Sequence, residues 1–217
     1  MYYITKKTAK IRYKTAALIL KHLTPVLYKK LDVSVFIKNE VFQFKLDDIS
    51  IDTRPSVEFM KEIFHGKLVK GAELGVERAR NSKSILRELN IEKLYLIDAW
   101  DNYKGIDGIW SNIDENHKHV LRILGNDKRV EIIKNFSNVA VKDIKDNSLD
   151  FVYVDANHKY EYVYQDIKSW YPKVKNNGFM AGHDVCIPDV IKAVKEFCSN
   201  KSIKFQTEIP DWYFVKQ

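Results

Sequence analysis

Four residues in the second half of the sequence could do acid–base chemistry or hold a metal ion. Asp155 and His158 follow one apolar run, and His183 and Asp184 follow the next apolar run along the chain. If the two runs are neighbouring parallel strands, they lie about 4.8 Å apart and bring these side chains to one edge of a sheet. Two carboxylates that close repel each other unless a proton or a cation lies between them.

Three interpretations of this group are possible from the residues alone. In the first, Asp155, His183 and Asp184 hold a divalent cation, for which oxygen ligands favour Mg²⁺ and a histidine shifts the preference toward Mn²⁺, Fe²⁺ or Zn²⁺. In the second, Asp155, His158 and Asp184 form a metal-free catalytic site, since a histidine can take up a proton near neutral pH. In the third, Asp155 only orients His158 and Asp184 caps a turn.

A second candidate site is a glycine turn earlier in the sequence. Gly75 follows the predicted strand Lys70–Leu74, and a glycine there lets the backbone turn sharply and approach a ligand. The glycine pattern of a dinucleotide-binding turn is missing, because Ala79 occupies a later position of the loop. Asp98 stands 23 residues after Gly75, where a carboxylate can accept hydrogen bonds from ribose hydroxyls. The turn therefore favours a nucleoside without phosphates.

The elements that must position these residues alternate between strand and helix. We predict strands at Lys70–Leu74, Lys93–Asp98, Val130–Lys134, Phe151–Asp155, Gly178–Ala181, Ile203–Ile209 and Trp212–Val215. A helix begins at Pro55, and further helices are predicted at Ser82–Leu89, Asp114–Leu124, Glu161–Trp170 and Asp189–Cys198. This alternation predicts an α/β fold, a doubly wound, mostly parallel sheet of seven strands. The short connection around Pro210 makes the last strand pair antiparallel.

The first 52 residues are predicted to form a separate basic extension. A helix over residues 5–31 and two short strands, Val33–Ile37 and Val41–Leu46, indicate a helix-plus-hairpin cap in front of a domain at 53–217. Residues 1–50 hold ten Lys and Arg against four Asp and Glu, which accounts for +6 of the net charge of +7. This charge indicates either an anionic partner, such as nucleic acid, or an ordinary solvated helix face.

The composition favours a soluble cytoplasmic protein. A chain of 217 residues with 45% hydrophobic content fits one α/β domain with a short extension. No apolar run approaches the roughly 20 residues that span a bilayer. The two cysteines, Cys186 and Cys198, are too few for a disulfide framework. The sequence leaves the oligomeric state open, a homo-oligomer included.

Together these segments resemble class I S-adenosylmethionine-dependent methyltransferases. Glu73–Val76 is similar to the first motif of that fold, and Leu96–Trp100 is similar to the second. Within the class, Phe151–Tyr160 and the stretch Asp166–Asp184 resemble the branch that methylates hydroxyls of sugars, macrolides and other natural products. The resemblance covers about residues 68–217 and implies a Rossmann-like fold. Ala79 and His183 depart from the family pattern, which often has a glycine and an acid at those positions.

The resemblance also implies the site residues. The turn at Glu73–Gly75 would hold the amino-acid end of the cofactor, Asp98 its ribose, and Ser137 would lie near its adenine. The implied cofactor-binding residues are Glu73, Leu74, Gly75, Val76, Asp98, Ala99, Trp100, Ser137 and Asp155. In metal-dependent relatives, the positions of Asp155, His183 and Asp184 hold a divalent cation, Mg²⁺ or Mn²⁺.

The predicted function is therefore O-methylation of a small molecule or a sugar or glycan precursor, with S-adenosylmethionine and a divalent metal. The hydroxyl would lose its proton to Asp155 or His158. One alternative is an RNA or DNA methyltransferase that uses the basic extension, although the Asp155–His158 segment lacks the Asp/Asn-Pro-Pro-aromatic run of amino-methylating enzymes. A second alternative is a non-catalytic domain that retains the fold. The missing glycines weaken a third, a nicotinamide-dependent oxidoreductase.

Overall fold

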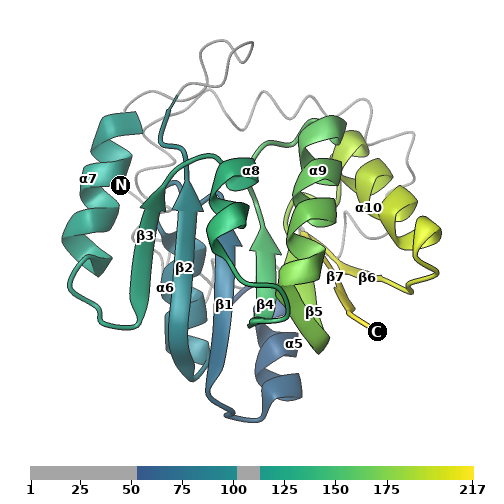
Figure 1. The fold of residues 1–217 in the computed structure, drawn as a ribbon, viewed down its shortest axis with the longest axis horizontal. Helices are drawn as coiled ribbons and strands as arrows, with labels where there is room; N and C mark the ends of the chain where they lie inside the picture. The colour runs from purple at the N-terminus through teal and green to yellow at the C-terminus, as the bar shows by residue number, and fades with distance from the viewer. Residues whose placement is uncertain (1–52, 102–112) are drawn as a thin grey trace, which may run out of the picture. The chain divides into compact units, whose positions relative to one another are not determined.

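The computed structural model describes residues 53–101 and 113–217 (Figure 1). The predicted helix and hairpin of the basic extension lie outside the described residues. The division of the chain at residues 52 and 53 therefore stays a prediction. The described unit begins at Thr53 and runs to Gln217.

Within the described residues, seven strands form one sheet. The strands are β1 Val69–Leu74, β2 Ile91–Asp98, β3 Val130–Lys134, β4 Leu149–Val154, β5 Val174–Gly182, β6 Gln206–Glu208 and β7 Asp211–Val215. Their order across the sheet is β3-β2-β1-β4-β5-β7-β6. Strands β1 to β5 are parallel, whereas β7 runs antiparallel to both β5 and β6. The predicted mostly parallel sheet with an antiparallel last pair is confirmed.

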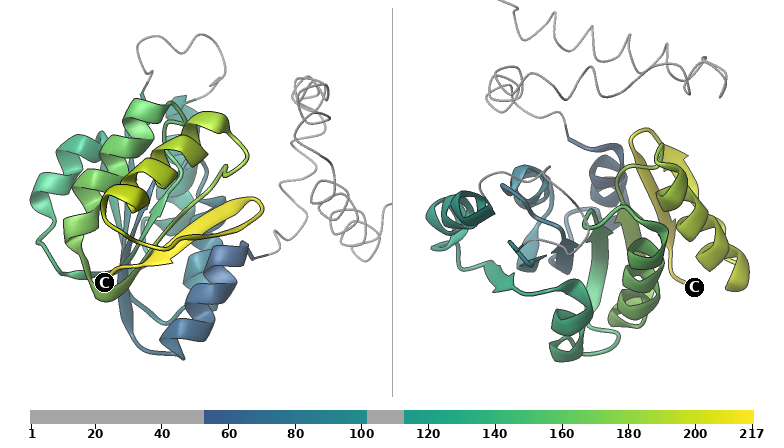
Figure 2. Two further views of the ribbon diagram at one scale, coloured as in Figure 1. Left: turned by 90° about the vertical axis from the view of Figure 1, so that its right-hand side faces the viewer. Right: turned by 90° about the horizontal axis from the view of Figure 1, so that it is seen from above.

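Helices cover both faces of this sheet. They are α5 Pro55–Phe64, α6 Arg80–Glu88, α7 Ile113–Leu124, α8 Ser137–Ala140, α9 Tyr160–Trp170 and α10 Pro188–Asn200, with two 3₁₀ turns, η1 Val141–Asp143 and η2 Tyr171–Lys173. The apolar side chains of α5, α6 and α7 belong to one buried cluster and those of α8, α9 and α10 to another. Figure 2 shows the two helical layers on opposite sides of the sheet, which is the doubly wound arrangement.

Strand β4 shows how the sequence builds this two-sided core. Phe151 and Tyr153 belong to the cluster on one face, and Val152 and Val154 belong to the cluster on the other. This division follows from the alternation of side chains along a strand. Because both faces are covered, the strand is a continuous apolar run, as is typical of a central parallel strand. It delivers Asp155 to the carboxyl edge of the sheet.

Strands β5 and β6 differ most in length from the prediction. Strand β5 begins at Val174, four residues before the predicted Gly178, because the exposed residues Asn176 and Asn177 carry no apolar signal. Strand β6 covers only Gln206–Glu208 and its residues are all exposed. The predicted longer strand relied on the buried Ile203, which belongs to the core but lies outside the strand. Within the described residues, no helix is long and apolar enough to cross a membrane.

Candidate active site

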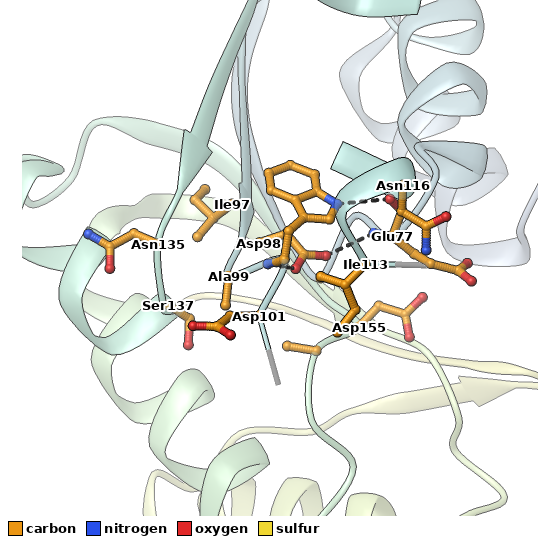
Figure 3. Close-up of a pocket in the computed structure, with 13 residues that line it drawn as sticks. Glu77, Ile97, Asp98, Ala99, Asp101, Ile113, Asn116, Asn135, Ser137 and Asp155 are labelled. Carbon is orange, nitrogen blue, oxygen red and sulfur yellow. Dashed lines mark hydrogen bonds between the residues drawn. The ribbon is translucent and has the colours of Figure 1, made fainter. Parts of the chain in front are cut away.

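A pocket opens at the carboxyl ends of the central strands (Figure 3). It holds about 640 Å³ of space, part of which is open to solvent. Its lining residues come from the turn after β1, from the end of β2 and from the segments after β3 and β4: Gly75, Glu77, Ile97, Asp98, Ala99, Trp100, Asp101, Ile113, Asn116, Asn135, Ser137, Asp155 and Ala156. Of the nine predicted cofactor-binding residues, the pocket is lined by Gly75, Asp98, Ala99, Trp100, Ser137 and Asp155.

Gly75 is needed where β1 and β4 end side by side. Its φ of 83° is in the left-handed region, and a Cβ there would lie 2.0 Å from the carbonyl oxygen of Asp155. The backbone N–H of Asp155 donates to the carbonyl oxygen of Leu74 at 2.7 Å. The sequence predicted a close approach at Gly75. The approach in the structure is to the chain segment that carries Asp155.

Two other residues of the turn also have the left-handed backbone conformation that favours glycine. Glu77 and Ala79 also have positive φ values, of 50° and 59°. Left-handed residues therefore alternate along the loop at Gly75, Glu77 and Ala79. A non-glycine residue in this conformation costs about 1 kcal/mol or more. Ala79 therefore stands in a backbone conformation that favours glycine, which adds strain.

Asp98 holds this loop through its carboxylate. Its Oδ2 accepts hydrogen bonds from the backbone N–H groups of Val76, at 2.8 Å, and Glu77, at 2.9 Å. Its Oδ1 accepts from the backbone N–H of Trp100, at 2.8 Å. The indole N–H of Trp100 donates in turn to the carbonyl oxygen of Glu77, at 3.0 Å. Asp98, which is predicted to bind the ribose, thus also fixes the backbone of the pocket wall.

Glu73, Leu74 and Val76 are buried and are not among the pocket-lining residues. The Glu73 carboxylate accepts hydrogen bonds from Asn81, at 3.0 Å, and from the hydroxyl of Ser82. Burial raises the pKa of Glu73 to about 7, although these two donors partly oppose the shift. The first motif therefore contributes its backbone and a buried carboxylate that binds the beginning of α6.

Ser137 is held in the pocket wall by two contacts with α9. Its hydroxyl donates to Oδ1 of Asp166, and its carbonyl oxygen accepts from the indole N–H of Trp170 at 3.2 Å. Asp166 is 4% exposed. Burial raises the pKa of Asp166 to about 7, although the hydrogen bond from Ser137 opposes the shift. Both α9 residues lie in the stretch that carried the family resemblance, which gave them no role.

Next to the pocket lies an acid–histidine cluster made of Asp155, His158, His183 and Asp184. Nε2 of His158 lies 2.9 Å from Oδ2 of Asp184 and 3.7 Å from Oδ1 of Asp155. Nδ1 of His183 lies 3.1 Å from Oδ1 of Asp184 and 3.8 Å from Oδ1 of Asp155. The four predicted residues are thus brought together at the ends of β4 and β5.

Charges within the cluster shift the pKa values of its members. Burial disfavours the charged imidazole of His158, but Asp155 and Asp184 outweigh it and raise the pKa of His158 to about 9. Burial of Asp184 is likewise outweighed by His158 and His183, which hold the pKa of that carboxyl well below its usual range. In the absence of a cation, the cluster at neutral pH therefore holds a protonated His158 between two carboxylates.

The donor set of this cluster fits a divalent cation. Ligand atoms of Asp155, His158 and Asp184 all lie within 4.8 Å of one another. Nε2 of His158 is buried and makes no well-directed hydrogen bond, in spite of its short distance to Asp184. Two carboxylates and an imidazole suit Mn²⁺ or a similar ion. His158 is part of this group, whereas His183, the histidine that the sequence predicted as a ligand, is not.

Arg54 is a site residue that sequence reasoning missed. Its Nη1 donates to Oδ2 of Asp155, at 2.8 Å, and to the hydroxyl of Tyr153, at 2.6 Å. Arg54 and Asp155 are 101 residues apart in the chain. Arg54 stands just before Pro55, outside every motif. No local pattern could have found it.

The fold and the site together define a class of protein. The sheet is doubly wound and has one reversed strand, and the pocket lies at a glycine turn after β1 and an acid after β2. These features are those of a Rossmann-like, class I methyltransferase fold. The family model described as a methyltransferase domain matches residues 72–185, more than half of the 217 residues. The chain belongs to this family. It is an S-adenosylmethionine-dependent methyltransferase, as the resemblance of the sequence implied.

Solved structures show the same fold at low sequence identity. A proposed caffeoyl-CoA O-methyltransferase from Staphylococcus aureus has a TM-score of 0.61 and 13% identity, covering 94% of this chain and 100% of that chain. The O-methyltransferase NovP has a TM-score of 0.52 and 18% identity, covering 74% and 79%. The MycE methyltransferase of the mycinamycin biosynthetic pathway, in complex with Mg and SAH, has a TM-score of 0.52 and 14% identity, covering 75% and 48%. No curated protein matches the chain.

Proposed function

We propose that the chain transfers a methyl group from S-adenosylmethionine to a hydroxyl of a small molecule or a sugar or glycan precursor, assisted by a divalent metal. The observation that carries this proposal is the double position of Asp155. It lines the pocket, and it belongs to the acid–histidine cluster. A cofactor in the pocket and a hydroxyl in the cluster would therefore meet at one residue. The solved structures of O-methyltransferases with this fold support the choice of oxygen as the acceptor.

In the pocket, different residues would contact different parts of the cofactor. Asp98 would accept hydrogen bonds from the ribose hydroxyls, Ser137 would lie near the adenine, and the turn at Gly75 would hold the amino-acid end. S-adenosylmethionine, when bound, supplies an electrophilic methyl group on a positively charged sulfur. The task of the protein is then to position the acceptor and to exclude water.

On the acceptor side, Asp155 and His158 are the candidate proton acceptors. Asp155, His158 and Asp184 would hold the cation, with His158 in the place that the sequence assigned to His183. A bound divalent cation would lower the pKa of the acceptor hydroxyl, as it does for bound water.

We place this activity in the cytoplasm. Both cysteines, Cys186 and Cys198, are free thiols, which agrees with a reducing compartment. For the basic extension, both interpretations of its charge stay open: it binds an anionic partner, or it is a solvated surface. The homo-oligomer also stays a prediction.

The test is a methyl-transfer assay with labelled S-adenosylmethionine and Mn²⁺, against a panel of sugars, other hydroxylated small molecules and RNA. We expect label on a hydroxyl oxygen of a small molecule, and loss of at least about 100-fold in rate for Asp155→Asn. The control Asp150→Asn changes a carboxylate that bonds Lys70 and Lys175 and is absent from the pocket and the cluster. Label on RNA alone would instead support the nucleic-acid alternative.

A further inference from the structure

Arg54 places a partly buried positive charge against the acid–histidine cluster. Its side chain is 20% exposed, and Nη1 lies 2.8 Å from Oδ2 of Asp155. The guanidinium carbon lies 5.3 Å from the centre of the Tyr153 ring. An arginine in a protein does not lose its proton. Arg54 is therefore a permanent cation beside the carboxylate that joins the pocket to the cluster.

The contacts of Arg54 divide the two oxygens of Asp155 between different partners. Oδ2 accepts the hydrogen bond from Arg54. Oδ1 faces the two histidines, 3.7 Å from Nε2 of His158 and 3.8 Å from Nδ1 of His183. One oxygen is therefore available to an occupant of the cluster. Bidentate binding by Asp155 would use the oxygen that already accepts from Arg54, next to the positive charge of the guanidinium.

Buried hydrogen bonds hold Arg54 in this position. The Tyr153 hydroxyl, which accepts from Arg54, donates to Oδ1 of Asp211 at 3.0 Å. Oδ2 of Asp211 accepts from the backbone N–H of Ser56, at 3.2 Å, and from the Ser56 hydroxyl. Tyr153, Asp211 and Ser56 are all fully buried. Withdrawal of the guanidinium would leave the buried Tyr153 hydroxyl with one of its two hydrogen bonds.

We propose that Arg54 is a resident cation of the cluster, which presents Asp155 through Oδ1 alone and weakens the binding of divalent cations there. This inference rests on the proposed function, because it assumes that the cluster is the metal site. A unit charge a few ångströms from a divalent ion changes its affinity by about tenfold, even at the dielectric constant of water. Arg54 touches Asp155 and does not line the pocket, so it is a positioning residue.

The test compares Mn²⁺ binding by isothermal titration to the full chain and to three variants. We expect Arg54→Met to bind Mn²⁺ at least about tenfold more tightly than the wild type, because the charge is gone. Arg54→Lys keeps the charge and should bind like the wild type. The control Lys173→Met removes a positive charge just before β5, at the end of the strand opposite the cluster, and should not change the affinity. Equal or weaker binding by Arg54→Met overturns the inference.

Two further arms separate this inference from its alternatives. Arg54→Gln removes the charge and keeps a hydrogen-bond donor, so it should also bind Mn²⁺ more tightly than the wild type. It replaces Arg54→Met in the test if that variant does not fold. Each sample is also titrated with S-adenosylhomocysteine. If every sample binds S-adenosylhomocysteine and none binds Mn²⁺, the role of Arg54 is overturned and the methyltransferase proposal stands. If Mn²⁺ binding tightens as expected but S-adenosylhomocysteine does not bind, the cofactor proposal fails and the role of Arg54 stands.

Discussion

At the scale of single residues, the metal site depends on which of two histidines, His158 or His183, is the ligand. The sequence offered both His158 and His183, and the family resemblance assigned the metal to the position of His183, where relatives often have an acid. In the structure, His158 Nε2 completes a compact donor group with Asp155 and Asp184, and His183, 3.1 Å from Asp184, is outside that group. Spacing along the chain could not decide this, because it depends on how the turns after β4 and β5 fold back.

The two histidines should therefore differ in their effect on metal binding. We expect His158→Ala to weaken Mn²⁺ binding by at least about tenfold, because it removes a ligand atom, and His183→Ala to weaken it less. Isothermal titration of Mn²⁺ into each variant measures the difference. A larger loss for His183→Ala would restore the ligand set that the sequence favoured.

Two other residues show where sequence reasoning reaches its limit. The family resemblance predicts that Glu73 contacts the cofactor, which stays a prediction, but it gave no sign that the carboxylate is buried against the beginning of α6. Arg54 was not predicted at all, since its contact with Asp155 spans 101 residues. The identity of a motif residue could be read from the sequence. The direction of its side chain and its distant partners depend on packing.

At the scale of elements, the short helix α8 is the piece of the pocket that the hydrophobic pattern did not predict. It has four residues, too few for a helical period to show. Its first residue, Ser137, is tied to α9 through Asp166 and Trp170. The pocket wall after β3 is therefore fixed by a helix that comes later in the chain, and its stability should follow the protonation of Asp166.

Asp166 predicts a pH dependence of stability. Burial raises its pKa to about 7 from 3.8, so the folded protein binds a proton that the unfolded chain has lost between those pH values. The contribution of Asp166 is then fully present below about pH 4 and is lost as the pH rises to about 7. We expect the stability of the wild type relative to Asp166→Asn to fall by about 1–3 kcal/mol between pH 5 and pH 8.

Urea unfolding of both proteins at several pH values measures this difference. The comparison with Asp166→Asn matters because Glu73, whose pKa is also raised to about 7 by burial, contributes a loss of the same sign in both proteins. A difference between the two proteins that stays constant from pH 5 to pH 8 would show that Asp166 is ionised in the fold, contrary to the expected state.

Most of the larger elements could be predicted because their patterns are physical consequences of burial. The central strands β1, β2 and β4 carry apolar runs, and β4 buries every residue but Asp150. Asn176 and Asn177 in the first half of β5 and the whole of β6 are exposed and polar, so no apolar pattern marks them. The sequence therefore located β1 to β4 to within two residues at each end, whereas it missed the beginning of β5 and both bounds of β6.

At the scale of the whole molecule, the arrangement of the sheet brings distant segments to one edge. The order β3-β2-β1-β4-β5-β7-β6 puts β1 between β2 and β4, so the Gly75 turn lies between Asp98 and Asp155. Hydrogen bonds join all three segments, from Val76 to Asp98 and from Asp155 to Leu74. The fold and the approximate site could be predicted from the strand pattern and the family resemblance. The hydrogen bonds between the segments could not.

The proposed function depends above all on this edge binding S-adenosylmethionine through Asp98 and the Gly75 turn. Isothermal titration of S-adenosylhomocysteine into the full chain tests this binding without the need for an acceptor. The control Asp127→Ala removes another carboxylate that accepts a backbone N–H, but one outside the pocket.

We predict micromolar binding by the wild type and by Asp127→Ala. For Asp98→Ala we predict a loss of about 100-fold or more, because the ribose ligand and three backbone contacts disappear together. Absence of binding to the wild type, or unchanged binding to Asp98→Ala, would show that the cofactor does not bind at this edge in the proposed way.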